Sequence, residues 1–117
     1  WQDAENGYVK YSEQAGDEIM FTFEGTGASI EGWWVKTGGK ADVYVDGVFK
    51  RTIDCFYYYA KQEHRNINIF HILNLEEGKH TINIVVKGEK REESEGCAIG
   101  VRGAVVYKNG TKSYDAI

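Results

Sequence analysis

The segment GTGASIEGWWVKTGGKADVYVDGVFKRTIDCF (residues 25–56) carries the clearest structural signal in this chain of 117 residues. Residues 41–45 read ADVYV and alternate apolar with polar side chains, the period of a strand with one buried face. Asp46-Gly47 follows directly, and this dipeptide strongly favours a two-residue hairpin turn. Alternating strands joined by tight turns predict a twisted antiparallel sheet.

The same alternation recurs on both sides of this segment. Residues 18–23 and 80–87 each place three apolar side chains on one face. Further strands are expected at 8–11, 28–32, 48–55, 67–73 and 97–107, and no helix is expected. About eight strands with a turn every 8–12 residues predict an all-β protein, and we expect a two-sheet antiparallel β-sandwich of the jelly-roll type. The predicted core contains Ile19, Phe21, Phe23, Val43, Val45, Ile82, Ile84 and Val86.

Length and composition indicate one domain, residues 1–117, with its core in residues 8–107. Residues 108–117 are expected to form an exposed tail or the start of a linker. Charged residues make up 27% of the chain and no run nears the roughly 18 apolar residues of a bilayer span, so no membrane partner is expected. The net charge of −4 argues against nucleic acid as a partner. The chain does not begin with Met, and we expect it to be excised from a longer protein.

If successive strands run antiparallel, the long connections collect at one end of the sandwich. These are residues 12–17, 33–40, 56–66 and 88–96, and the short turns at 24–27, 46–47 and 76–79 fall at the other end. Long loops on a rigid scaffold usually carry function. The long-connection end is therefore the predicted functional end.

A search for catalytic chemistry finds no nucleophile elbow, no phosphate-binding glycine loop and no metal-spaced His/Cys cluster. The three histidines are scattered, and the acidic residues of 88–96 are mixed with Lys and Arg as on a solvated surface. No enzyme activity, no catalytic residue and no cofactor are therefore predicted. The metal content is unknown, and a structural calcium ion stays open because Asp-rich turns suit a hard cation.

Cys55 and Cys97 both lie at strand ends on the long-connection side. They allow one internal disulfide or two free thiols, and the sequence leaves both alternatives open. A secreted protein would permit the bond, whereas a cytoplasmic one would not.

The predicted ligand-binding residues are aromatic and basic and belong to two of the long connections: Trp33, Trp34, Lys36, Tyr57, Tyr58, Tyr59 and Arg65. Sugar rings have apolar C–H faces that stack on flat aromatic side chains, and their hydroxyl groups need hydrogen-bond partners. The alternative is that these rings cap the end of the sandwich. Because adjacent residues of an extended chain face opposite ways, about half of the rings are expected to be structural.

Four motifs resemble the jelly-roll modules of the galactose-binding-domain-like superfamily: FTFEGTG at 21–27, GKADVYVDG at 39–47, LEEGKHT at 75–81 and GEK at 88–90. Such modules are accessory domains of secreted bacterial carbohydrate-active enzymes, so the resemblance implies the fold and a secreted or cell-surface location. The motifs belong to turns and core. Binding residues in such modules lie in variable loops, so none is transferred to this chain.

Together these observations predict a non-catalytic carbohydrate-binding module that tethers an attached enzyme to a polysaccharide, with neutral plant glycans expected because of the negative charge. The expected partners are a polysaccharide or oligosaccharide and a neighbouring catalytic domain of the same parent chain. The alternative is a structural spacer or protein-interaction module whose aromatic end packs against a neighbouring domain. A small esterase or glycosidase would need a polar catalytic cluster, which the sequence does not show.

Overall fold

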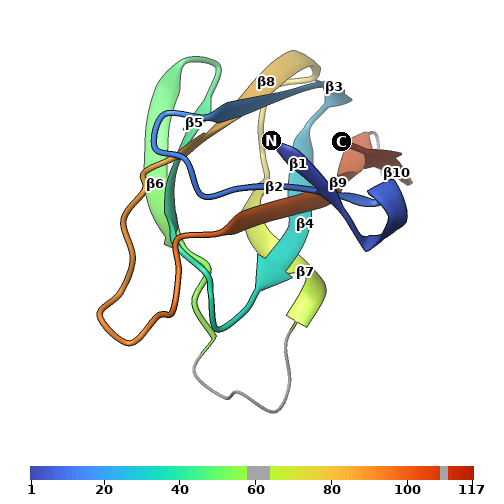
Figure 1. Ribbon diagram of the computed structural model, residues 1–117. Coiled ribbons are helices and arrows are strands. Elements are labelled where there is room, and N and C mark those ends of the chain that lie inside the picture. Colours follow the sequence, from blue (N-terminus) through green and yellow to red (C-terminus); the bar gives the residue numbers. More distant parts are fainter. Residues whose placement is uncertain (58–63, 109–110) are drawn as a thin grey trace.

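The computed structural model describes residues 1–57, 64–108 and 111–117, which form ten strands and one 3-10 turn (Figure 1). None of the helical segments among these residues is long and apolar enough to cross a membrane. The elements are β1 (Gln2–Ala4), η1 (Glu5–Gly7), β2 (Val9–Ser12), β3 (Glu18–Gly25), β4 (Gly27–Trp34), β5 (Lys40–Val45), β6 (Val48–Asp54), β7 (His64–Ile72), β8 (Gly78–Val86), β9 (Ile99–Lys108) and β10 (Thr111–Ala116).

The strands form two antiparallel sheets packed face to face. One sheet has the order β1-β2-β9-β4-β7 with β10 also paired to β9, and the other has the order β3-β8-β5-β6. From β2 to β9 the chain changes sheet at every connection except the β5–β6 hairpin, which is the strand order of a jelly roll. The predicted all-β two-sheet sandwich is confirmed, although the described residues contain ten strands rather than eight.

The core lies between the sheets and contains the side chains that alternation predicts. Six of the eight predicted core residues are buried to 5% exposure or less. Ile19 and Phe21 are only half-buried and pack against the margin of the core. Their strand, β3, is an edge strand of its sheet and has a neighbouring strand, β8, on one side only. Side chains on its inner face are therefore less completely covered than those of central strands.

The chain connections are segregated as strand parity predicts. The β5–β6 hairpin lies at the top of Figure 1, and the long β8–β9 connection lies at the bottom with the end of β4. One boundary differs from expectation: the predicted loop at 33–40 begins two residues later, because β4 runs on to Trp34. Strand β4 lies between β9 and β7, and its pairing of Trp34 with His64 extends the ladder through both tryptophans. Strand β7 likewise begins at His64, inside the loop expected at 56–66.

Residues 111–116, expected in a tail or linker, instead form strand β10. Strand β2 pairs with β9 only at Ile99–Val101, which leaves the rest of that edge of β9 open. Strand β10 pairs along Gly103–Lys108 on this free stretch. All six residues of β10 are exposed, so backbone hydrogen bonds rather than apolar burial hold it in place.

His80 connects the two turns at the short-connection end. Its Nδ1 lies 2.6 Å from the Asp46 carboxylate, and its Nε2 lies 2.6 Å from the carbonyl oxygen of Glu76. Both partners are acceptors, so the pair of contacts requires the doubly protonated ring. The hydrogen bonds to Asp46 and Glu76 raise the pKa of His80 above its ordinary value. The hydrogen bonds from His80 and from the Thr81 amide lower the pKa of Asp46.

Truncation of Phe23 to alanine should lower the free energy of unfolding by about 3–5 kcal/mol, because it removes a ring that is 5% exposed in the core. The matched control is Met20→Ala on the same strand, where the side chain is 62% exposed and the loss should stay within about 0.5 kcal/mol. Urea unfolding measures both variants. Equal losses would contradict the assignment of the two faces of β3.

The stabilisation from His80 should be complete below the ordinary histidine pKa of about 6.5 and disappear as the pH rises through the raised folded-state pKa. The free energy of unfolding, measured by urea between about pH 6 and about pH 8.5, should therefore fall with pH. His80→Gln should flatten this dependence, whereas His71→Gln, on an exposed position of β7, should preserve it. A slope that survives in His80→Gln would assign the pH effect to another group.

Candidate functional site

Three aromatic rings meet at the long-connection end. Trp34 ends β4, Tyr57 follows β6 and His64 begins β7. The ring centroid of Trp34 lies 4.7 Å from that of Tyr57 and 5.7 Å from that of His64, and Tyr57 and His64 are 4.7 Å apart in an edge-to-face arrangement. We call these three residues the ring trio.

Backbone pairing brings the members of the ring trio together. Trp34 and His64 are cross-strand partners in the β4–β7 ladder. The next residue, Val35, accepts a hydrogen bond from the amide of Tyr57 at 3.0 Å and donates one to the carbonyl of Cys55 at 3.0 Å. The rings are therefore positioned by strand ends rather than by the interior of a loop.

A cavity of about 190 Å³ adjoins Trp34. It lies between β6 and β7, which are edge strands of the two different sheets, and it is lined by Trp34, Asp54, Cys55, Ile67, Asn68 and Ile69. Asp54 accepts hydrogen bonds from the Phe56 amide and the Arg91 Nε, both at 3.1 Å. The cavity thus places Trp34 beside an oriented carboxylate.

Trp33 lies outside the ring trio, on the outer face of the six-stranded sheet. Its ring stacks on Tyr11 at 5.3 Å, and the Arg65 guanidinium lies over it at 4.8 Å. Its indole Nε1 donates a hydrogen bond to Glu5 at 2.6 Å. Only 7% of Trp33 is exposed, so its position is that of a packing residue.

The remaining predicted site residues are distributed between these locations. Lys36 is exposed, and its ammonium group lies 3.9 Å from the Glu95 carboxylate. The structure therefore brings Trp34 and Tyr57 together, pairs Trp33 with Arg65 elsewhere and directs Lys36 to the β8–β9 connection. Tyr58 and Tyr59 lie outside the described residues. The role of all seven residues in binding stays a prediction.

Cys55 and Cys97 are both free thiols. Cys55 donates its backbone N–H to Gly39, and Gly39 donates in turn to Ala98, both at 2.9 Å. The backbone at Gly39 therefore lies between the two cysteine-bearing segments, and the disulfide alternative stays a prediction. Burial raises the pKa of the Cys55 thiol to about 12.

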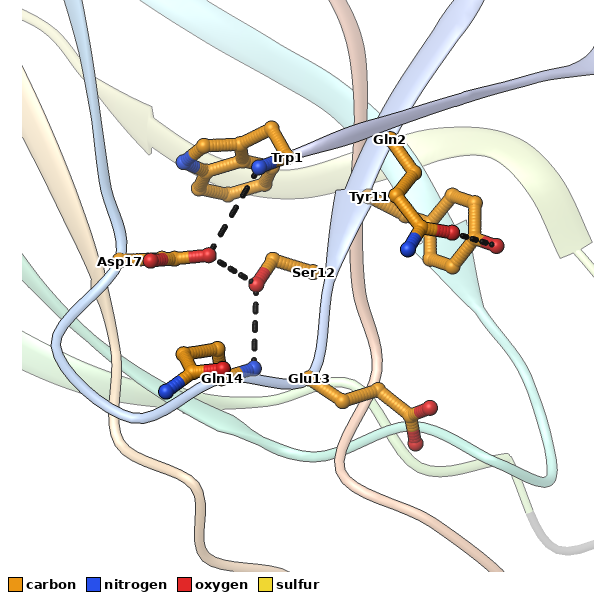
Figure 2. Close-up of a pocket in the computed structure, with 7 residues that line it drawn as sticks. All are labelled: Trp1, Gln2, Tyr11, Ser12, Glu13, Gln14 and Asp17. Atoms are coloured by element: carbon orange, nitrogen blue, oxygen red, sulfur yellow. Dashed lines mark hydrogen bonds and ion pairs between the residues drawn. The ribbon is translucent and has the colours of Figure 1, made fainter.

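A second hollow, of about 570 Å³, lies at the β2–β3 connection and is lined in part by Trp1 and Tyr11 (Figure 2). Its polar groups mostly bond to one another. The Ser12 hydroxyl donates a hydrogen bond to the Asp17 carboxylate at 2.5 Å and accepts one from the backbone N–H of Gln14 at 3.0 Å. These bonds hold the connection in shape and leave few polar groups directed at a ligand.

Asp54 and Asn68 were not predicted from the sequence. Asn68 belongs to the alternating run NINIF at 66–70, which could have placed its amide on an exposed face. Asp54 carries no such signal, because its position beside Trp34 depends on the approach of β6 to β7. No group of three His, Cys, Asp or Glu side chains suited to a metal ion occurs in the part of the chain that the structure describes. The question of a structural calcium ion, which the sequence left open, stays open.

No family model and no curated protein sequence matches the chain. Among solved structures, a xanthan lyase from Paenibacillus is similar over 93% of this chain and 11% of its own, with a TM-score of 0.60 and 11% identity. A family two carbohydrate esterase from Clostridium thermocellum, solved in complex with cellohexaose, is similar over 91% of this chain and 28% of its own, with a TM-score of 0.51 and 19% identity. The chain therefore shares its fold with small parts of two carbohydrate-active enzymes.

Alkylation of the native protein with iodoacetamide at about pH 8 should modify Cys97 alone, because Cys55 is buried and its raised pKa leaves almost no thiolate. Intact mass spectrometry should count one adduct before and two after unfolding. Cys97→Ser should remain unmodified in the native state. A native mass two hydrogens lower with no adduct would show a disulfide and contradict the structure.

Proposed function

We propose that the protein is a non-catalytic carbohydrate-binding module that holds an attached enzyme at a polysaccharide. The observation that carries this proposal is the ring trio at the margin of the Trp34 cavity. An indole face beside oriented polar groups is suited to a sugar ring, whose C–H face stacks while its hydroxyls form hydrogen bonds.

The ring trio is prepared for binding before any ligand arrives. Tyr57 and His64 pack against Trp34 and limit its rotation, so little side-chain freedom is lost on binding. The Asp54 carboxylate is held by Phe56 and Arg91 and offers its remaining lone pairs to ligand hydroxyls.

The charge of the site favours a neutral glycan. The chain carries a net charge of −4, and the carboxylate at the cavity already has the Arg91 guanidinium as its counter-charge. The described residues that line the cavity include no cation, so an acidic sugar would bring a further negative charge beside Asp54 without a partner among them. Neutral plant polysaccharides are therefore the proposed ligand class.

The fold comparisons support a role as one part of a larger enzyme. This chain matches only 11% of the xanthan lyase and 28% of the esterase, the proportions of a module within a longer protein. A weak module raises the effective concentration of its attached catalytic domain at an insoluble substrate without any contact to the reacting bond. A secreted or cell-surface location follows from such a role.

Trp34→Ala should weaken binding of cellohexaose and of neutral plant oligosaccharides by at least about tenfold, because stacking on one ring is worth roughly 1–3 kcal/mol by analogy with nucleic-acid bases. Isothermal titration calorimetry measures the affinity, and circular dichroism checks that the variant is folded.

The matched control is Phe49→Ala, which removes an aromatic ring that is 51% exposed on the other sheet and should leave the affinity unchanged. If the parent protein binds no glycan of the panel, or if Trp34→Ala binds as tightly as the parent, the proposal fails. The spacer or interaction module would then replace it.

A further inference from the structure

A groove of about 490 Å³ lies on the outer face of the six-stranded sheet and shares no lining residue with the ring trio. It is lined by two tyrosines and three polar or charged side chains: Tyr8, Glu31, Asn66, Arg102 and Tyr114. These residues come from the η1–β2 turn and from β4, β7, β9 and β10, which pack side by side in this sheet (Figure 1). We call this hollow the face groove.

The backbone of η1 is strained where it forms one wall of the face groove. Glu5, Asn6 and Gly7 have φ angles of 50°, 60° and 87°, and two of the three are not glycine. Such conformations persist only where surrounding contacts hold them. Here the Glu5 carboxylate accepts a hydrogen bond from the Trp33 indole N–H and lies 3.6 Å from the Arg102 guanidinium. The same guanidinium lies 5.6 Å from the ring centroid of Tyr8, the residue after η1.

The floor of the face groove is shaped by an irregularity in β9. Glu31 pairs with Gly103 and Gly32 with Val101, so Arg102 is the extra residue of a β-bulge. A bulge redirects the side chain of its extra residue, and Arg102 is thereby turned into the face groove. Gly103 has no side chain, and a Cβ there would collide with the phenol of Tyr114. Tyr114 therefore packs directly against the backbone of β9 and forms part of the groove lining.

The exposed groups of the face groove match the surface of a sugar. Tyr8 is 67% exposed and Tyr114 is 50% exposed, so two largely accessible aromatic residues line the face groove. Among the described residues, the Glu31 carboxylate and the Asn66 amide have no side-chain hydrogen-bond partner. Arg102 is already matched by Glu5, and Glu31 adds a second carboxylate, so an acidic ligand would meet no surplus positive charge.

We propose that the face groove is a second glycan-binding site, which takes a neutral oligosaccharide between Tyr8 and Tyr114. This inference rests on the proposed function of the module, because it assumes the same class of ligand. The two sites share β4 and β7 but use different residues of these strands: the ring trio uses Trp34 and His64, and the face groove uses Glu31 and Asn66. Two sites on one rigid module would give avidity on a polymeric glycan.

The test is a titration of the uniformly ¹⁵N-labelled protein with cellohexaose, xylohexaose and mannohexaose, followed by NMR. We expect saturable shifts at the backbone amides of Arg102, Gly103 and Tyr114 in addition to those around Trp34. Tyr8→Ala should weaken the affinity obtained from the shifts of the groove amides by at least about tenfold. The affinity obtained from the amides around Trp34 should change less than twofold. Tyr44→Ala, on the other sheet, is the matched aromatic control and should change neither.

Glu31→Gln provides a second variant that preserves the shape of the face groove, and it should also weaken only the groove response. Shifts confined to the surroundings of Trp34 would overturn the second site and leave the proposed function intact. An absence of shifts at both sites with all three sugars would overturn both. Groove shifts that persist in Tyr8→Ala and in Glu31→Gln would likewise overturn the assignment of these residues.

Discussion

Trp33 packs against the backbone of β9 because residue 100 is a glycine, and the outer face of the six-stranded sheet is organised around this contact. The buried indole stacks on Tyr11, lies under Arg65 and donates its N–H to Glu5, so β2, β7 and η1 all meet on one ring. Neighbouring residues of a strand face opposite ways, so the ring of Trp34 points away from Trp33 and contacts Tyr57 and His64. The buried Trp33 thus supports the η1 side of the face groove, whereas backbone pairing positions the ring trio.

The two surfaces are built in different ways. The ring trio lies where strands end and long connections begin, the usual place for a variable recognition site on a fixed scaffold. The face groove is formed by paired strands, a β-bulge at Arg102 and a strained turn at Glu5 and Asn6. The contacts of Glu5 with Trp33 and Arg102 offset the strain of that turn. The shape of the face groove therefore depends on the Trp33 indole.

Most of the fold was predictable because its signals are local. Alternation identified the inner faces of β3, β5 and β8, and Asp46-Gly47 identified the β5–β6 turn. Expectations differed from the structure where pairing with a distant strand prevailed over local composition. The sequence WWVKTGGK (residues 33–40) reads as a loop, but the pairing of Trp34 with His64 on β7 extends β4 through both tryptophans. Residues 111–116 read as a tail, but the free edge of β9 recruits them as β10.

The amino-acid sequence alone specified an all-β sandwich, the segregation of long and short connections and the end of the molecule where aromatic residues concentrate, since these follow from the order and spacing of neighbouring residues. It did not specify which rings meet. Trp34 joins Tyr57 and His64, Trp33 joins Tyr11 and Arg65, and Tyr8 and Tyr114 line one groove. Cys55 and Cys97 both lie beside the backbone of Gly39, but on opposite sides of it. Such contacts join residues far apart in the chain, and only the register of the strands and the space left by glycines at positions 100 and 103 select them.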